Sequence, residues 1–207
     1  MALTKVLTGG LAADSVDNTI LKLDDDYALT GTVSGAGGMD LILSDTISSS
    51  VAQYDISSTY INSTYDEYKL FYGLSIDVDN ANIFSRVFVG GTIQTGSIYA
   101  YQTDLMFNDG ASSSAAATFF NMHTSGLGAA TGEQLFGNIT LHNVNNDRAF
   151  NYTGMTNYYA ADATHRADAI GGSLIHANRT NVVNGFRLYP QSGNIILGTI
   201  KLFGIRK

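Results

Sequence analysis

The C-terminal segment, residues 182–207, constrains the fold most, because its side chains alternate in polarity along two short runs. Apolar and polar side chains alternate at 186–189 and again at 199–202, and a break rich in Pro, Ser, Gly and Asn separates these runs at 190–194. Alternation on both sides of such a break predicts two antiparallel strands joined by a loop, which is a β-hairpin. A strand that is built into a sheet does not fray. We therefore expect this hairpin to be part of the core.

The residues from 39 to 181 continue the same pattern. In the clearest run, 65–76, alternate side chains are apolar and share one face of the predicted strand. These side chains are Tyr68, Leu70, Tyr72, Leu74 and Ile76. Further strand-like runs are at 39–44, 51–56, 83–89, 92–106, 118–122, 136–144, 152–159 and 171–176. Residues 108–117 are small and low in complexity, and we expect them to form a surface loop.

The order of these runs predicts the fold class. No segment shows the period of a long helix, and turn residues separate the predicted strands. A succession of short strands predicts two antiparallel sheets that pack face to face. Because strand lengths and loops are uneven, we favour a jelly-roll-like antiparallel β-sandwich over a closed barrel. The predicted fold is therefore all-β, with the sandwich domain at 39–207.

The N-terminal residues 1–38 differ from the rest of the chain. Short apolar pieces alternate with glycine pairs and aspartate clusters, and residues 34–38 have the composition of a flexible joint. We predict an extended attachment arm at 1–38 that becomes ordered against another protein. The alternative is a leader that stays disordered.

The composition argues against several classes of partner and chemistry. Charged residues make up 14% of the chain, the net charge is −7, and the largest basic cluster is Arg206 with Lys207, so nucleic-acid binding has little electrostatic support. The absence of cysteine excludes disulfides, thiolate metal ligands and a cysteine nucleophile. No apolar run approaches the roughly 18 residues of a membrane span. The first residues do not resemble a signal peptide, so we expect assembly in a cytoplasm.

No catalytic or metal motif is complete, so we expect a protein that is not an enzyme and uses no metal or cofactor. The histidines lack the spacing of a helical metal site. The loop at 77–82 begins like a calcium loop, but Ala81 stands at the fifth ligand position and cannot bind a cation. A serine-hydrolase elbow at Ser173 is incomplete, because Ile175 replaces its second glycine. A carboxylate pair for glycoside cleavage remains open, since its members need not be close in sequence.

Five tyrosines are candidate contacts for a glycan, since they lie in or near stretches rich in predicted loops. They are Tyr99, Tyr101, Tyr152, Tyr158 and Tyr159. An exposed tyrosine ring can stack on a sugar ring while its hydroxyl bonds to sugar hydroxyls. The alternative is that these rings pack at the rim of the sandwich or between protomers.

Four short stretches, spread along the chain, together resemble one family. The C-terminal SGNIILGTIKLFGIRK at 192–207 is similar to a closing "SGNI…GTI+L(Y/F)GI+" pattern, where + is basic. Residues 126–133 (GLGAATGE) resemble a turn that leads into a strand ending in Leu-x-Asn, here at 141–143. Residues 63–68 (STYDEY) resemble the entry to an early strand, and residues 14–17 (DSVD) resemble leader segments. These patterns are typical of small virion proteins of tailed bacteriophages, especially marine phages.

The resemblance implies a structural protein of a phage virion, and it transfers no catalytic residue. We expect a tail fibre or receptor-binding (adhesin) component that attaches to other virion proteins through the arm at 1–38. Fibre proteins of this kind are commonly trimers, so a homotrimer is implied. The expected ligand is a glycan of the host surface, and the expected location is the virion, assembled in the host cytoplasm. A capsid decoration or cement protein is the first alternative, and a glycan depolymerase is the second.

Overall fold

The structure, a computed structural model, describes residues 38–65, 67–106 and 110–205. It confirms an all-β fold of two antiparallel sheets. The strands are β1 (Met39–Ile47), β2 (Tyr54–Ile56), β3 (Glu67–Ile76), β4 (Ile83–Val89), β5 (Thr92–Ile93), β6 (Tyr99–Leu105), β7 (Ala111–Ala117), β8 (Phe120–Asn121), β9 (Leu135–His142), β10 (Asn151–Tyr159), β11 (His165–Leu174), β12 (Val183–Pro190) and β13 (Ile195–Ile205). A single 3₁₀ turn, η1 (His176–Asn178), lies between β11 and β12. The predicted arm at 1–38 lies outside the described residues except for Gly38.

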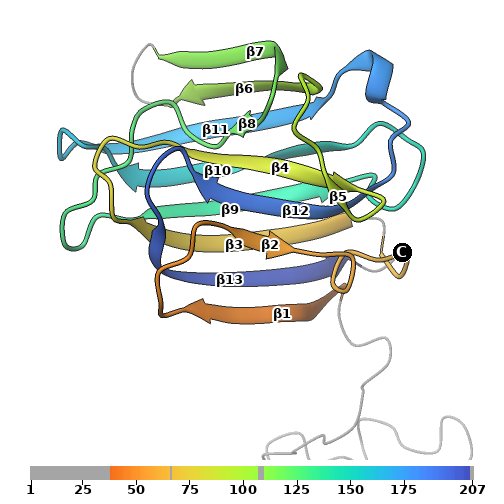
Figure 1. The fold of residues 1–207 in the computed structure, drawn as a ribbon, viewed down its shortest axis with the longest axis horizontal. Coiled ribbons are helices and arrows are strands. Elements are labelled where there is room, and N and C mark those ends of the chain that lie inside the picture. Colours follow the sequence, from red (N-terminus) through yellow and green to blue (C-terminus); the bar gives the residue numbers. More distant parts are fainter. Residues whose placement is uncertain (1–37, 66, 107–109, 206–207) are drawn as a thin grey trace, which may run out of the picture. The chain divides into compact units, whose positions relative to one another are not determined.

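The two sheets form the two layers of a sandwich (Figure 1). The larger sheet has eight strands in the order β1-β13-β3-β9-β10-β11-β6-β7. The smaller sheet has the order β2-β12-β4-β5, and β8 also pairs with β4. Because β12 occupies one edge of β4, the short strands β5 and β8 take opposite ends of its other edge.

The C-terminal strands correct the predicted hairpin. Both strands and the loop between them are present, but β12 pairs with β2 and β4, whereas β13 pairs with β1 and β3. The chain crosses from one sheet to the other at 191–194, where Gly193 has a φ of +72° and the Asn194 N–H donates to Asp77 Oδ1 at 2.6 Å. Alternation in polarity indicates that each strand has one buried face, but it does not specify the partner strand.

The segment at 108–117 is a second correction. Residues 111–117 form β7, an edge strand that pairs with β6, rather than the predicted loop. Every side chain of β7 is serine or alanine, so no contrast between apolar and polar positions reveals the strand. The backbone ladder of an edge strand does not require large side chains, and a sequence pattern therefore misses it.

The core lies between the sheets and follows the predicted alternation. Tyr68, Leu70, Tyr72, Leu74 and Ile76 of β3 are all buried, which confirms the face predicted for 65–76. Each fully buried aliphatic side chain stabilises the fold by roughly 1.5–3 kcal/mol. On the neighbouring strand β9, a Cβ at Gly137 would lie 2.0 Å from the Tyr72 ring, so only glycine leaves room for that ring.

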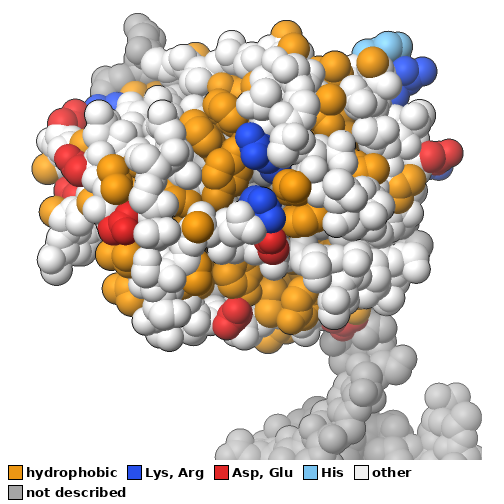
Figure 2. All heavy atoms as spheres, in the orientation of Figure 1, with side chains coloured by type: hydrophobic (Ala, Val, Ile, Leu, Met, Phe, Trp, Pro, Cys, Tyr) orange, Lys and Arg blue, Asp and Glu red, His pale blue; other side chains and the backbone are white. Residues whose placement is uncertain are grey.

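The outer face of the smaller sheet carries few charges among apolar and neutral polar side chains (Figure 2). Arg86 and Arg187 are opposite one another on β4 and β12. Arg187 forms a two-pronged ion pair with Asp55 at 2.6 and 2.7 Å, and Arg86 lies over the Tyr189 ring at 5.1 Å from its centroid. These contacts offset the repulsion that two adjacent guanidinium groups would otherwise cause.

Candidate functional site

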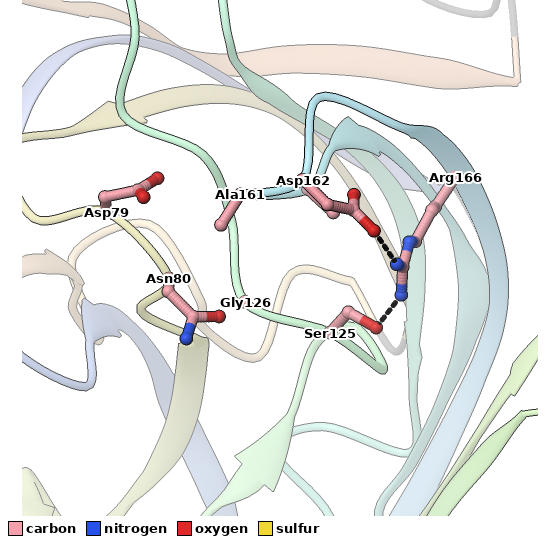
Figure 3. Close-up of a pocket in the computed structure, with 8 residues that line it drawn as sticks. Asp79, Asn80, Ser125, Gly126, Ala161, Asp162 and Arg166 are labelled. Carbon is pink, nitrogen blue, oxygen red and sulfur yellow. Dashed lines mark hydrogen bonds and ion pairs between the residues drawn. The ribbon is translucent and has the colours of Figure 1, made fainter.

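A polar pocket of about 600 Å³ lies where three loops meet at one end of the sandwich (Figure 3). The loops connect β3 to β4, β8 to β9, and β10 to β11. The residues that line the pocket are Asp79, Asn80, Ser125, Gly126, Ala160, Ala161, Asp162 and Arg166. In Figure 3, Asp79 and Asn80 lie on one side, and Asp162, Arg166 and Ser125 lie on the other.

Backbone contacts hold the three loops together. Leu127 forms isolated β-bridges with Ala81 on one side and with Ala160 on the other. Asn80, whose φ is 59°, donates its N–H to the Leu127 carbonyl at 2.9 Å. A Cβ at Gly126 would lie 2.2 Å from Asn80 Oδ1 and 2.7 Å from the Asn80 backbone, so this approach requires glycine. The pocket floor is therefore set by close backbone packing.

Arg166 and Asp162 form an ion pair on the far wall. Arg166 Nη2 donates to Asp162 Oδ2 at 2.7 Å, and Nη1 donates to the Ser125 hydroxyl. Hydrogen bonds from Thr164, with a further contribution from Arg166, hold the pKa of Asp162 below its ordinary value. Asp162 therefore stays ionised at neutral pH, and the pair contributes no net charge. On the opposite side, Asp79 Oδ1 accepts the Ala129 N–H at 3.2 Å.

A buried network behind the pocket fixes the wall at Thr124 and Ser125. Asp168 is fully buried, and its Oδ2 accepts the Thr124 N–H at 2.5 Å and the Tyr158 hydroxyl at 3.3 Å. Burial raises the pKa of Asp168, while the hydrogen bonds from Thr124 act in the opposite direction. The Tyr158 hydroxyl also accepts the Ser125 N–H at 3.1 Å. Both residues of the wall are thus tied to side chains of β10 and β11.

His123 joins this network as a neutral imidazole. The Ile83 N–H donates to its Nε2 at 2.8 Å, so its Nδ1–H donates to the Ser125 carbonyl. Burial lowers the pKa of His123 to about 4. With both nitrogens engaged inside the protein, the imidazole connects the start of β4 to the pocket wall and is not presented to a ligand.

The pocket is suited to binding hydroxyl groups. Asp79 offers carboxylate acceptors, Asn80 offers an amide that both donates and accepts, and Arg166 has N–H groups beyond those it uses within the protein. In the described part of the chain, no group of three or more His, Cys, Asp or Glu side chains is arranged to hold a metal ion. The geometry therefore provides hydrogen-bonding groups around a cavity large enough for a sugar residue.

Comparisons with known proteins give no match. No protein-family model, no curated protein and no solved structure is similar to the chain. Over the residues that the structure describes, no helix is long and apolar enough to cross a membrane. The function must therefore be inferred from the geometry and from the resemblance in short motifs.

The five candidate tyrosines do not form one site. Tyr99, Tyr152 and Tyr158 are fully buried in the core, so these three rings are not exposed for contact with a glycan. They pack inside the sandwich, whereas the alternative expectation placed them at its rim or between protomers. Tyr101 is half-buried on β6, and Tyr159 is 45% exposed on β10 beside His165. Glycan contact stays a prediction for Tyr101 and Tyr159.

Sequence reasoning missed the pair Asp162–Arg166 and the buried Asp168. The predicted strand began at 171, whereas β11 begins at His165, because polar side chains at 166 and 168 face the inside of the sandwich and break the alternation. Two segments that the sequence did single out, 77–82 and 126–133, both contribute to the pocket. Their convergence was not predicted, because the residues are far apart in the chain.

Proposed function

We propose that this protein is a structural component of a phage virion that binds a host-surface glycan in its polar pocket. The observation that carries the glycan part is the pocket itself, in which Asp79, Asn80 and the Asp162–Arg166 pair surround one cavity. The virion part is supported by the resemblance of four short stretches to virion proteins of tailed phages. A β-sandwich of low surface charge is consistent with display on a particle.

The charges of the pocket favour a neutral sugar over an acidic one. The Asp162–Arg166 pair cancels internally, so Asp79 leaves one uncompensated negative charge among the lining side chains. An acidic sugar would be repelled by that carboxylate, whereas a neutral sugar donates hydroxyl hydrogens to it. The ligand class is therefore a neutral, hydroxyl-rich glycan.

The ionisation of the carboxyl groups in and behind the pocket favours binding of a glycan over its cleavage. Glycoside hydrolysis requires a general acid whose pKa is raised, placed against the scissile bond. The pKa of Asp162 is lowered, and Asp168, whose pKa is raised, is buried behind the pocket wall. We therefore place the depolymerase alternative second to binding.

The test measures binding of neutral oligosaccharides from the host surface to the full chain. Asp79→Asn should weaken binding by roughly tenfold, since a hydrogen bond to a charged group contributes about 1.5–3 kcal/mol. Asp147→Asn removes the same charge from an exposed residue outside the pocket and should leave binding unchanged. Equal affinity for both variants would contradict the glycan site, and shortening of the oligosaccharide would support the depolymerase instead.

Labelling of the protein on assembled particles tests the virion part separately. We expect signal at the tail fibres or tail tip. Signal over the head would contradict the fibre proposal and support a decoration or cement protein, whatever the outcome of the binding test.

A further inference from the structure

We infer that the outer face of the eight-stranded sheet binds a second copy of this chain around a two-fold axis. The outer face is the side of this sheet that points away from the smaller sheet. It is built from alternate residues of each strand, such as Lys69 and Phe71 of β3 and Phe136 and Asn138 of β9. This inference concerns self-association and does not depend on the proposed glycan site.

Large apolar side chains are concentrated on this face. Phe136 is 55% exposed, Met155 is 43% exposed and Leu41 is 56% exposed. Phe71 and Phe203, on adjacent strands, meet edge to face with ring centroids 5.8 Å apart. Monomeric proteins rarely leave an apolar patch of this kind uncovered, so the face is expected to contact a partner.

Two lysines lie at one side of the face, and an aspartate lies at the other. Lys69 and Lys201, the lysines of the described sequence, lie on β3 and β13 and face outward. Asp104 lies outward on β6, at the other side of the sheet. Among the described residues, no carboxylate lies within ion-pair distance of either lysine, and Asp104 bonds to the Gln102 side chain. Lys69 lies over the Phe71 ring, at 5.5 Å from its centroid, so all three charged groups remain able to form an ion pair with a partner chain.

One row of residues links these charges across the face. Successive strand pairings align Lys201 with Phe71, Phe71 with Asn138, Asn138 with Met155, Met155 with Ala169, and Ala169 with Asp104. The row therefore runs from a basic end through an apolar centre to an acidic end. Five strand spacings separate its ends, or about 24 Å.

The size of the outward side chains also changes across the face, from β13 to β6. Phe71, Phe203 and Lys69 have large side chains on the β3 and β13 side, whereas β11 presents only Ala169 and Gly171. Beside these small residues, a shallow, open depression extends over β6, β7, β10 and β11. One half of the face is therefore raised and carries both lysines, together with Glu67, which is paired with His142 at 3.0 Å. The other half has smaller side chains and carries Asp104.

A two-fold axis parallel to the strands, above the gap between β9 and β10, matches these halves. Rotation about this axis places each row of one copy opposite the same row of the other copy, with the order of the strands reversed. Lys201 of one copy then faces Asp104 of the other, Phe71 faces Ala169, and Lys69 faces Gly171. The covered area, about 24 Å wide and as long as a strand of about eight residues, approaches the roughly 800 Å² per partner of a stable interface. Charge and shape are thus complementary between two identical faces, and this favours a second copy as the occupant.

The test is the mass of the full chain in solution, measured by sedimentation equilibrium. We expect twice the chain mass of 22.1 kDa. Lys201→Glu and Asp104→Lys should each weaken self-association by about tenfold or more, because symmetry repeats each new like-charge pair twice. An equimolar mixture of these two variants should restore a two-chain species, since the acidic face of one then meets the basic face of the other.

Asp147→Lys makes the same charge change on an exposed loop and should leave the mass unchanged. Each variant should retain the wild-type far-ultraviolet circular dichroism, because the substituted side chains are exposed. A wild-type monomer, a three-chain mass as implied by the fibre resemblance, or failure of the mixture to associate would each overturn the two-fold interface. A monomer whose affinity for host polysaccharide falls with Phe136→Ser would also overturn it and assign the face to a glycan.

Discussion

His123 shows how a single residue links the stability of the sandwich to the shape of the pocket. Its imidazole accepts one backbone hydrogen bond at the start of β4 and donates another to the pocket wall. Protonation would place a second hydrogen on Nε2, opposite the Ile83 N–H, and would bury a charge. The neutral form is therefore built into the fold.

We predict that His123 makes the fold less stable at acidic pH. Its pKa is about 4 in the folded chain and 6.5 in the unfolded chain, so the unfolded state binds more protons between these values. The effect of His123 on the free energy of unfolding is absent above pH 6.5. As the pH falls toward 4, the buried neutral imidazole lowers that free energy by an amount on the order of 3 kcal/mol. Urea unfolding of the wild type and of His123→Gln across this range measures the difference in slope.

The comparison between variants is needed because Asp168 acts in the opposite sense. Burial raises the pKa of its carboxyl, so protonation of Asp168 favours the folded state at low pH. His176→Gln, at an exposed position, is the matched control and should keep the wild-type slope. An unchanged slope in His123→Gln would contradict the neutral buried imidazole.

At the scale of elements, the larger sheet depends most on β13. It lies between β1 and β3 and pairs with both along most of its length. Its buried side chains Ile195, Ile200 and Leu202 enter the core. Its loss would expose the edges of both neighbours and remove part of the core.

We predict that deletion of residues 195–207 abolishes cooperative folding. Three buried aliphatic side chains contribute roughly 1.5–3 kcal/mol each, and their sum is comparable to the whole stability of a typical domain. Denaturant unfolding followed by circular dichroism is the measurement. Thr199→Ala, on the exposed face of β13, should change the free energy of unfolding by about 0.5 kcal/mol or less. A cooperative transition in the shortened chain would contradict the central role of β13.

At the scale of the whole molecule, the described residues between 38 and 205 contain a continuous sandwich core. Its largest buried side chains come from both sheets and form a single cluster. A domain with one continuous core folds without help from segments outside it. We therefore expect the attachment role predicted for the arm at 1–38 to be separable from the folding of the sandwich.

We predict that deletion of residues 1–38 preserves the sandwich and prevents its incorporation into particles. The thermal midpoint of the shortened chain should stay close to that of the full chain, as followed by circular dichroism. Its content in purified particles, measured by immunoblotting, should fall to background. Loss of cooperative unfolding would place the arm in the core, and normal incorporation would contradict its proposed attachment role.

Alternating polarity in the sequence determined the fold class and much of the core. Each strand has two faces, and the side chains themselves specify which face avoids water, as in Tyr68 to Ile76 of β3. That information is local, so it holds whichever strand lies alongside. It also explains why β7, with small side chains throughout, was not predicted.

Only the tertiary structure decided which strands pair and where a site forms. β12 and β13 alternate as a hairpin would, yet they lie in different sheets, because backbone hydrogen bonds form equally well with many partners. The pocket brings together Asp79, Ser125 and Arg166, which lie on three separate loops and strands. Likewise, Lys201 and Asp104 lie in one row across the sheet, with four strands between them. The order of the strands sets this arrangement, and it cannot be read from the sequence.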